Sequence, residues 1–216
     1  MTSKQSIVVT GGAGFIGSAL VRHLIAETEA RVVTVDRLGY AGSLLNLHDV
    51  RDHPRHHFEQ VDITNGTALS DVFARHQPTA VMHLAAESHV DRSIDRPADF
   101  IQSNLVGTYQ VLDCSLRYLA SLNAPQAARF RVLHVSTDEV YGSLSLDAPA
   151  FREGDAYQPN SPYSASKAGA DHLAMAWAHT FGLPVLVTNC TNNYGPYQFP
   201  EKLIPLAILN ALAGRE

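Results

Sequence analysis

Three residues that could take part in proton transfer follow one another in the sequence: Thr137, Asp138 and Glu139, within the stretch STDEVYG. Adjacent carboxylates on a regular strand would point to opposite faces. At the end of a strand that turns into a loop, however, both side chains can reach one cavity. The elimination of water requires an acid and a base around a common substrate. The stretch therefore indicates either this chemistry or a solvated pair of acidic turn residues.

A second pair, Tyr163 and Lys167, has Y-x-x-x-K spacing in a stretch of helical character. Residues four apart lie on one face of a helix. A tyrosine phenol with its usual pKa of about 10 is a poor base at neutral pH. A nearby ammonium and a positively charged nicotinamide ring would stabilise the phenolate, which could then take a hydroxyl proton as hydride leaves the substrate.

A glycine-rich turn near the start of the chain predicts the source of that nicotinamide. Gly11, Gly14 and Gly17 form G-x-x-G-x-x-G, with Phe15 and Ile16 between the last two. Glycines permit a tight turn and let the backbone approach a pyrophosphate, which the helix N-terminus then binds through its free N–H groups. A glycine triplet alone is weak evidence, but this one lies between a predicted strand and an amphipathic helix, as a dinucleotide site requires.

Two carboxylates further along are placed to contact the adenosine part of a dinucleotide. Asp36 ends the second predicted strand, where a carboxylate accepts both ribose hydroxyls and repels a 2′-phosphate, which favours NAD over NADP. Arg37 beside it weakens that preference. Asp62 follows the third strand and is placed either to meet the adenine edge or to cap a helix with Thr64.

The elements that must position these residues alternate along the chain. We predict strands at Ser6–Thr10, Arg31–Asp36, His57–Val61, Ala80–Leu84, Phe130–Ser136 and Pro184–Asn189. We predict helices near Gly14–Ala26, Ala68–His76, Pro97–Ser121, Pro162–Phe181 and Leu203–Ala213, and a loop at Ser143–Asn160. This alternation indicates an α/β fold, a doubly wound parallel sheet of the Rossmann type. Ligands of such sheets bind at the carboxyl ends of the strands.

Length and composition restrict the class of protein. A chain of 216 residues with 45% hydrophobic and 17% charged residues is expected to form one domain over positions 1–216. The net charge is 16 − 21 = −5, without the clustered basic surface that a nucleic-acid binder needs. We expect no membrane span and no signal peptide. Only two cysteines are present, which favours a cytoplasmic location.

Eleven histidines raise the question of a metal site. His53, His56 and His57 cluster, but no cysteine or carboxylate beside them completes a zinc-like spacing, so we expect a solvated loop and no metal. His83 and His134 fall within predicted buried strands, where we expect them to be hydrogen-bonded core residues.

Several stretches together resemble the extended short-chain dehydrogenase/reductase family and, within it, the dTDP-glucose 4,6-dehydratases. The matching stretches are TGGAGFIGSALVRHL, VDRLGYAGSLLNL, MHLAAESHVDRSI, NLVGTYQVL, HVSTDEVYG, SPYSASKAGADHL, TNCTNNYGPYQFPEKLIPL and NALAGRE. They cover the chain from end to end. Related 4-epimerases would share Tyr163 and Lys167 but are not expected to carry Asp138 and Glu139. One departure is Gly39, where this family usually has threonine, which implies a modest change at the adenosine pocket.

The resemblance implies a lyase that dehydrates dTDP-glucose and regenerates its NAD. Tyr163, tuned by Lys167 and assisted by Thr137, would deprotonate the C4 hydroxyl while hydride moves to NAD. The 4-ketone acidifies the C5 proton, which Glu139 would remove while Asp138 protonates the C6 hydroxyl. Hydride return to C6 would then give dTDP-4-dehydro-6-deoxy-glucose.

The resemblance also implies binding residues and an assembly. Besides the residues already named, it places Ile63, Leu84, Ala85 and Ala86 at the cofactor, and Ser88, Thr137, Asn192, Lys202 and Leu203 at the substrate. It implies a homodimer in which the two long helices near Pro97–Ser121 and Pro162–Phe181 pair with those of a second copy.

Two alternatives stay open at this point. The chain could serve a related nucleotide-sugar epimerase or dehydratase, or it could be an NAD-binding module without turnover. Members of the resembling family continue well past the position that matches Glu216, with much of the nucleotide pocket beyond it. We therefore expect this chain to bind NAD, to close poorly on the sugar nucleotide, and to expose an apolar surface where the remaining lobe would pack.

Overall fold

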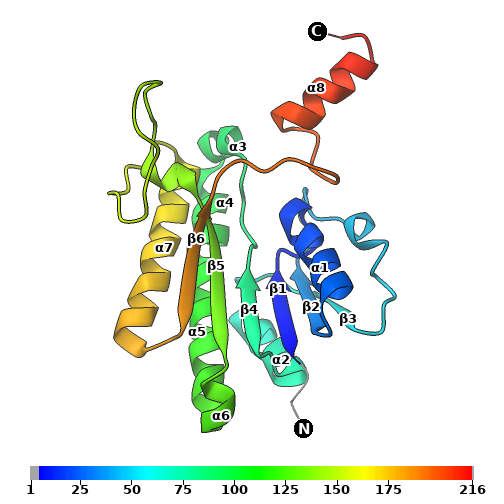
Figure 1. Cartoon of the computed structure of the whole chain (residues 1–216), viewed down its shortest axis with the longest axis vertical. Helices are drawn as coiled ribbons and strands as arrows, with labels where there is room; N and C mark the ends of the chain where they lie inside the picture. The colour runs from blue at the N-terminus through cyan, green and yellow to red at the C-terminus, as the bar shows by residue number, and fades with distance from the viewer. Residues whose placement is uncertain (1–4, 216) are drawn as a thin grey trace.

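The computed structural model describes residues 5–215, which form one six-stranded parallel sheet between layers of helices (Figure 1). The strand order is β3-β2-β1-β4-β5-β6, and every neighbouring pair is parallel. The strands are β1 Ser6–Thr10, β2 Arg31–Asp36, β3 His56–Gln60, β4 Ala80–His83, β5 Arg131–Thr137 and β6 Val185–Cys190. All six predicted strands are present, with bounds shifted by at most one residue.

Alternate residues of the central strands supply two separate cores, because successive side chains of a strand point to opposite faces. On β1, Val8 faces a core with Val33 and Val81. Its neighbours Ile7 and Val9 face the other core with Val32. Both faces of these strands are therefore buried, as is typical of a parallel sheet.

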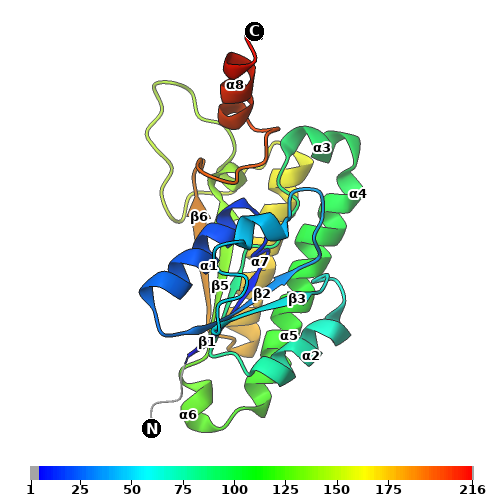
Figure 2. The same cartoon turned by 90° about the vertical axis from the view of Figure 1, so that its right-hand side faces the viewer.

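Helices cover the two faces unequally (Figure 2). Buried residues of α2 (Gly66–His76), α5 (Gly107–Ser121) and α7 (Pro162–Phe181) pack in one core, and those of α1 (Phe15–Glu27) pack in the other. On the outer strand β6, Leu186 is 53% exposed. The sheet is thus closed over the strands that hold the glycine turn and open near its β6 edge.

The start of α7 shows how the sequence fixes a functional helix. Ser161 is the N-cap, and its side chain and that of Ser164 accept hydrogen bonds from each other's backbone N–H, which forms a capping box. Pro162 follows at the first helical position, as predicted. The helix ends at Gly182, which has φ +70°. Both ends of the helix that carries Tyr163 are therefore determined locally.

The predicted helix over Pro97–Ser121 is present with its predicted bounds, but its hydrogen-bonding pattern changes along its length. Short helices α3 (Val90–Asp95) and α4 (Pro97–Phe100) precede a π-helical segment, Ile101–Val106, which leads into α5. A π-turn inserts one residue and often marks a functional site. Here it carries Asn104, which is 1% exposed and bonds to the backbone of Glu87, an interaction that the hydrophobic pattern does not encode.

The histidines also differ in part from expectation. His56 starts β3, is buried, and its Nε2 lies 2.9 Å from Thr34 Oγ1, so it belongs to the core and not to a solvated loop. His83 is hydrogen-bonded to Thr10 and Thr108, as predicted. Within residues 5–215, no three histidine, cysteine or acidic residues gather as metal ligands would.

The last helix, α8 (Leu203–Leu212), projects away from the body of the molecule (Figure 1). None of its residues is buried. Leu203 and Leu212 are 82% and 80% exposed, so this part of the chain carries the exposed apolar surface that the sequence predicts. Among the helices of the described residues, none combines the length and hydropathy that crossing a membrane would need.

Candidate active site

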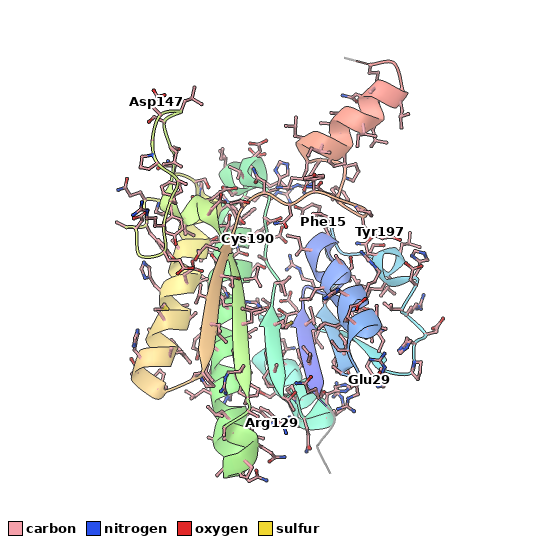
Figure 3. All side chains as sticks on the ribbon, in the orientation of Figure 1. Phe15, Glu29, Arg129, Asp147, Cys190 and Tyr197 are labelled. Atoms are coloured by element: carbon pink, nitrogen blue, oxygen red, sulfur yellow. The ribbon has the colours of Figure 1, made fainter. Side chains whose placement is uncertain are left out.

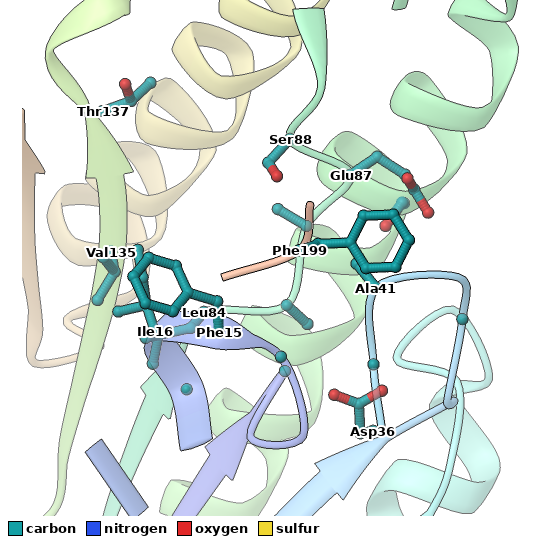
Figure 4. Close-up of a pocket in the computed structure, with 18 of the residues that line it drawn as sticks. Phe15, Ile16, Asp36, Ala41, Leu84, Glu87, Ser88, Val135, Thr137 and Phe199 are labelled. Atoms are coloured by element: carbon teal, nitrogen blue, oxygen red, sulfur yellow. The ribbon is translucent and has the colours of Figure 1, made fainter. Parts of the chain in front are cut away.

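A single elongated pocket lies at the carboxyl ends of the strands and holds most of the predicted site residues (Figure 4). Asp36, at the end of β2, and Thr137, at the end of β5, lie at opposite ends of it. The cavity encloses about 330 Å³, the size of a small-molecule site. Its predicted cofactor residues are Gly11, Gly14, Phe15, Ile16, Gly17, Asp36, Asp62, Ile63, Leu84, Ala85 and Ala86.

The glycine turn has the geometry that a pyrophosphate requires. Gly11 has φ +70°, and a Cβ there would lie 2.7 Å from the Ala85 backbone. A Cβ on Gly17 would lie 2.1 Å from the carbonyl oxygen of Gly11. The N-cap of α1 is Gly14, which offers no side-chain acceptor, so the helix N-terminus is open to an anion. These residues fit a dinucleotide.

The two predicted adenosine contacts, Asp36 and Asp62, both accept hydrogen bonds from other residues of the chain. Asp36 is 9% exposed and accepts hydrogen bonds from the N–H groups of Ala13 (3.0 Å) and Leu38 (2.8 Å). Burial nevertheless raises the pKa of Asp36. Asp62 accepts hydrogen bonds from the backbone N–H and the hydroxyl of Thr64 in the turn before α2, and it also lines the pocket. It does not cap the helix, because the N-cap of α2 is Asn65.

The chemical end of the pocket joins α7 to the end of β5. Tyr163 is 8% exposed, and the Thr137 hydroxyl lowers the pKa of its phenol. Lys167 is 5% exposed and its Nζ donates to the carbonyl oxygen of Val135 at 2.9 Å. Glu139 follows on the next turn, and all four side chains line the pocket. The helix and the strand end thus bring together the residues that the sequence places 24 or more positions apart.

Burial is the main influence on the pKa values here. It raises the pKa of Glu139, and the neighbouring Asp138 raises it further. It also raises the pKa of Tyr163, to which Glu139 adds. Burial lowers the pKa of Lys167 to about 8. Without a bound cation, Tyr163 is therefore a neutral phenol, and added positive charge in the pocket is needed to make it a base.

Asp171 is a buried carboxylate behind the pocket that was not predicted from the sequence, and it does not line the pocket itself. It is 1% exposed and accepts hydrogen bonds from Ser136 Oγ (2.8 Å), Tyr157 OH (3.0 Å) and Asn189 Nδ2 (3.2 Å). His134 Nε2 lies 3.0 Å from its other oxygen. Its spacing is the available signal, because it follows Tyr163 and Lys167 by eight and four positions on the same helix face.

Not every predicted residue lies in the pocket. Ser88, Asn192 and Lys202 line it, and Lys202 Nζ donates to the carbonyl oxygen of Ser88 at 3.1 Å. Asp138 lies beside it, with one oxygen 3.4 Å from the Thr137 hydroxyl, but is not part of the lining. Leu203 is outside because α8 begins at this residue and leads away.

The segment 197–202, which follows β6, crosses the pocket and was not predicted in detail. Phe199 meets the ring of Tyr40 edge-on, and Glu201 accepts hydrogen bonds from Tyr40 OH and Arg92 Nε, both at 3.0 Å. Tyr197 lies by α1, where the Arg22 guanidinium covers its ring (Figure 3). The signal for this segment is the run of aromatic and polar residues in NNYGPYQFPEK.

The fold and site together define a dinucleotide-binding domain of the extended short-chain dehydrogenase/reductase type, with its tyrosine and lysine on one helix and a threonine on the adjoining strand. The chain belongs to the GDP-mannose 4,6 dehydratase family, whose sequence profile matches residues 8–216.

Among curated relatives, the chain is similar to dTDP-glucose 4,6-dehydratases. It is 59% identical to the protein of Shigella flexneri, covering 98% of this chain and 61% of the relative. It is 58% identical to that of Neisseria meningitidis, covering 98% and 59%. The chain thus spans about three fifths of the length of these relatives.

The chain is also similar in fold to solved structures of dTDP-glucose 4,6-dehydratases and of UDP-glucose 4-epimerases. The dTDP-glucose 4,6-dehydratase of Streptomyces venezuelae, with NAD and TYD bound, is 46% identical with a TM-score of 0.88, covering 97% of this chain and 63% of that one. A UDP-glucose 4-epimerase of Thermus thermophilus, in complex with NAD, is 29% identical with a TM-score of 0.83, covering 98% and 64%. The fold alone is therefore shared by dehydratases and epimerases, and only the sequence separates them.

Proposed function

We propose that this chain binds NAD and carries the catalytic groups for dehydration of dTDP-glucose to dTDP-4-dehydro-6-deoxy-glucose. One observation carries the proposal: a single pocket is lined at one end by Thr137, Glu139, Tyr163 and Lys167, and further along by the glycine turn and Asp36. The names of the relatives support the substrate, and the NAD in the solved structures supports the cofactor.

The glycine turn and Asp36 are the groups we assign to the pyrophosphate and to the adenosine ribose of the cofactor. Backbone N–H groups at the start of α1 receive the pyrophosphate, and Asp36 receives the ribose hydroxyls. When bound, NAD supplies a hydride acceptor that later returns the hydride to the substrate.

Tyr163 takes the proton of the C4 hydroxyl in this proposal. The Thr137 hydroxyl lowers the pKa of Tyr163 and so favours the phenolate. Lys167, fixed on the Val135 carbonyl, supplies positive charge on the same helix face. The raised pKa of Tyr163 keeps its phenol protonated until positive charge enters the pocket and lowers that pKa, so that the phenolate can form and act as the base.

Glu139 and Asp138 divide the elimination between them. Glu139 lines the pocket and removes the C5 proton, for which a carboxylate with a raised pKa is suited. Asp138 protonates the departing C6 hydroxyl. In the described structure it stands next to Thr137, so it reaches the substrate by a rotation of its side chain.

The surroundings of the site support three further parts of the proposal. The substrate end is less complete than the cofactor end, because no residue of α8, which begins at Leu203, is buried.

Tyr109 on α5 and Met175 on α7 are exposed, which supports a homodimer through these helices. Cys114 and Cys190 are free, which supports a reducing cytoplasmic location.

Calorimetry on the 216-residue chain tests the binding proposal. We expect NAD to bind with a dissociation constant at or below the micromolar range, and dTDP-glucose to bind at least about tenfold more weakly. UDP-glucose, which carries a different nucleoside, is the control for recognition of the thymidine part of the substrate. Failure of NAD to bind would overturn the proposal. Binding of dTDP-glucose as firmly as NAD would contradict the statement that the substrate end of the pocket is incomplete.

Glu139→Gln tests the chemistry, with formation of the 4-keto sugar as the measurement. Loss of a general base typically lowers turnover about 100-fold or more. Glu153→Gln is the matched control, because Glu153 lies exposed in the loop outside the pocket. Undiminished turnover in Glu139→Gln would exclude it as the C5 base.

A further inference from the structure

Two neighbouring residues at the end of β2 give opposite signals for the choice of dinucleotide. A carboxylate at this position favours a free ribose, whereas an arginine favours a 2′-phosphate. Asp36 gives the first signal and Arg37 gives the second, and both line the pocket. The contacts of Arg37 therefore decide whether its guanidinium is available to a 2′-phosphate.

Arg37 is held by two carboxylates from different loops. Its Nη1 lies 3.3 Å from Asp62 Oδ2, and its Nη2 lies 2.5 Å from Glu87 Oε1. The side chain of Glu87 is 14% exposed and that of Asp62 is 36% exposed, so Glu87 is the better shielded partner. Charge-assisted hydrogen bonds of this kind are stronger than neutral ones and are strengthened further by partial burial.

The backbone of Glu87 is fixed by the π-helical segment. Asn104 accepts from Glu87 N–H at 2.8 Å and donates to the Glu87 carbonyl oxygen at 2.9 Å. Its Nδ2 also donates to Ser166 Oγ at 2.9 Å, and Ser166 donates to the carbonyl oxygen of Tyr163. Glu87 is therefore anchored through a buried amide to the helix that carries the catalytic pair.

Each of the four charged side chains that line the pocket near the end of β2 is hydrogen-bonded or ion-paired. Asp36, Asp62 and Glu87 supply three negative charges, and Arg37 supplies one positive charge, so the group has a formal charge of −2. The next arginine along the rim, Arg92, is paired with Glu201. A 2′-phosphate placed here would meet uncompensated carboxylates, while the guanidinium that could bind it is already occupied.

We propose that Glu87, anchored by Asn104, is a positioning residue that withholds Arg37 from the ribose 2′ position and thereby sets the preference for NAD over NADP. This inference rests on the proposed function, since it concerns the same cofactor site. It assigns to a residue outside the glycine turn, and distant in sequence from Asp36, a part of the dinucleotide specificity.

The test compares NAD and NADP binding to variants of the 216-residue chain by calorimetry, with NADP measured by displacement of NAD where it binds weakly. In Glu87→Gln we expect the affinity for NADP to rise about tenfold, because the freed guanidinium gains a charge-assisted contact with the 2′-phosphate. The affinity for NAD should change less than about twofold. Asp99→Asn, which removes one charge near the same rim, is the control and should leave the ratio unchanged.

The double variant Glu87→Gln, Arg37→Met separates the specific effect from a general change of charge. We expect the gain in NADP affinity to disappear in it, because the gain requires the guanidinium. A gain that persists without Arg37, or equal losses for both dinucleotides in Glu87→Gln, would overturn the inference while leaving the proposed function intact. A wild-type chain that binds neither dinucleotide would overturn the proposed function and this inference with it.

Discussion

The β1–α1–β2 unit and the chain beyond β6 are built in opposite ways, although both contribute to one pocket. Val8 and Val9 of β1 are fully buried, in two different cores. The ten residues of α8 include no buried side chain. Between these extremes, the segment 197–202 is held over the pocket by surface contacts such as that of Glu201 with Arg92.

This difference separates cofactor binding from substrate binding in energetic terms. The cofactor end is fixed by backbone geometry and by the core, so its shape does not depend on what is bound. The substrate end depends on a segment whose contacts are partly exposed, and such contacts contribute little each. Changes in the first region should therefore alter both stability and NAD affinity, and changes in α8 should alter neither.

Gly17→Ala is expected to have the largest effect. The new Cβ would lie 2.1 Å from the carbonyl oxygen of Gly11, so the turn must open. We expect a loss of at least about 3 kcal/mol in the free energy of unfolding and a loss of NAD binding of about 100-fold or more. Denaturation by urea and calorimetry with NAD measure the two effects.

Gly39→Ala is the matched control in the same pocket, because its Cβ would first meet the flexible Arg37 side chain, at 3.4 Å. It should change stability by less than about 0.5 kcal/mol. Equal effects of the two variants would show that the glycine turn is not specially constrained.

Asp171→Asn comes next, because it alters a carboxylate that joins α7 to β5 and β6. An amide nitrogen would face donors such as Ser136 Oγ, so we expect a loss of about 2 kcal/mol in the free energy of unfolding at pH 7. Burial raises the pKa of Asp171, but the hydrogen bonds of His134 and Ser136 outweigh it and hold the pKa below its usual value. The charged form therefore stabilises the fold above a pH of about 4, and this contribution is lost as the pH falls further.

Urea denaturation of the wild type and Asp171→Asn at several pH values measures this dependence. The difference between them should narrow below a pH of about 4. Asp155→Asn, on the exposed loop, is the control for a general effect of charge. A difference that stays constant across this range would contradict a stabilising role of the charged carboxylate.

The sequence predicted what depends on local pattern. The strands, the glycine turn and the capped start of α7 follow from alternation, glycine spacing and the Ser161–Pro162 signal, and all are confirmed. The helix over Pro97–Ser121 was predicted with its correct bounds, but its π-helical segment Ile101–Val106 was not. That segment buries Asn104 against Glu87, a contact between residues 17 apart that no periodicity records.

The candidate site was predicted best where one motif fixes one element. Tyr163 and Lys167 share a helix face, and Thr137 and Glu139 share a strand end, so their meeting follows from the topology. The interactions of Asp171 and Arg37 were not recognised, because their partners lie on other elements: β5, a loop and β6 for Asp171, and two separate loops for Arg37. Leu203 was taken from a family motif, and the direction of α8 removes it from the pocket lining.

Lys167→Met is expected to change the free energy of unfolding by less than Asp171→Asn does, and to raise it instead of lowering it. Burial lowers the pKa of Lys167 to about 8 from 10.5, so the folded state holds its proton less firmly than the unfolded state. Below pH 8 this disfavours folding. We expect the variant to gain about 1–2 kcal/mol at pH 7 in the absence of NAD, less than the full pKa difference because the Val135 carbonyl loses its donor. The gain should fade as the pH rises from 8 to 10.5, and a pH-independent gain would contradict this account.

Leu212→Ala in α8 is expected to have the smallest effect, and Leu112→Ala in α5 is its matched reference. Leu112 is 1% exposed and Leu212 is 80% exposed, so the same deletion removes core packing in one region and solvated surface in the other. We expect the reference to lose about 2–5 kcal/mol in the free energy of unfolding and Leu212→Ala to lose less than about 0.5 kcal/mol. Urea denaturation of both variants measures the contrast. A loss above about 1 kcal/mol for Leu212→Ala would mean that α8 packs in solution against a surface that the described contacts do not include, and the two regions would then differ less than their burial indicates.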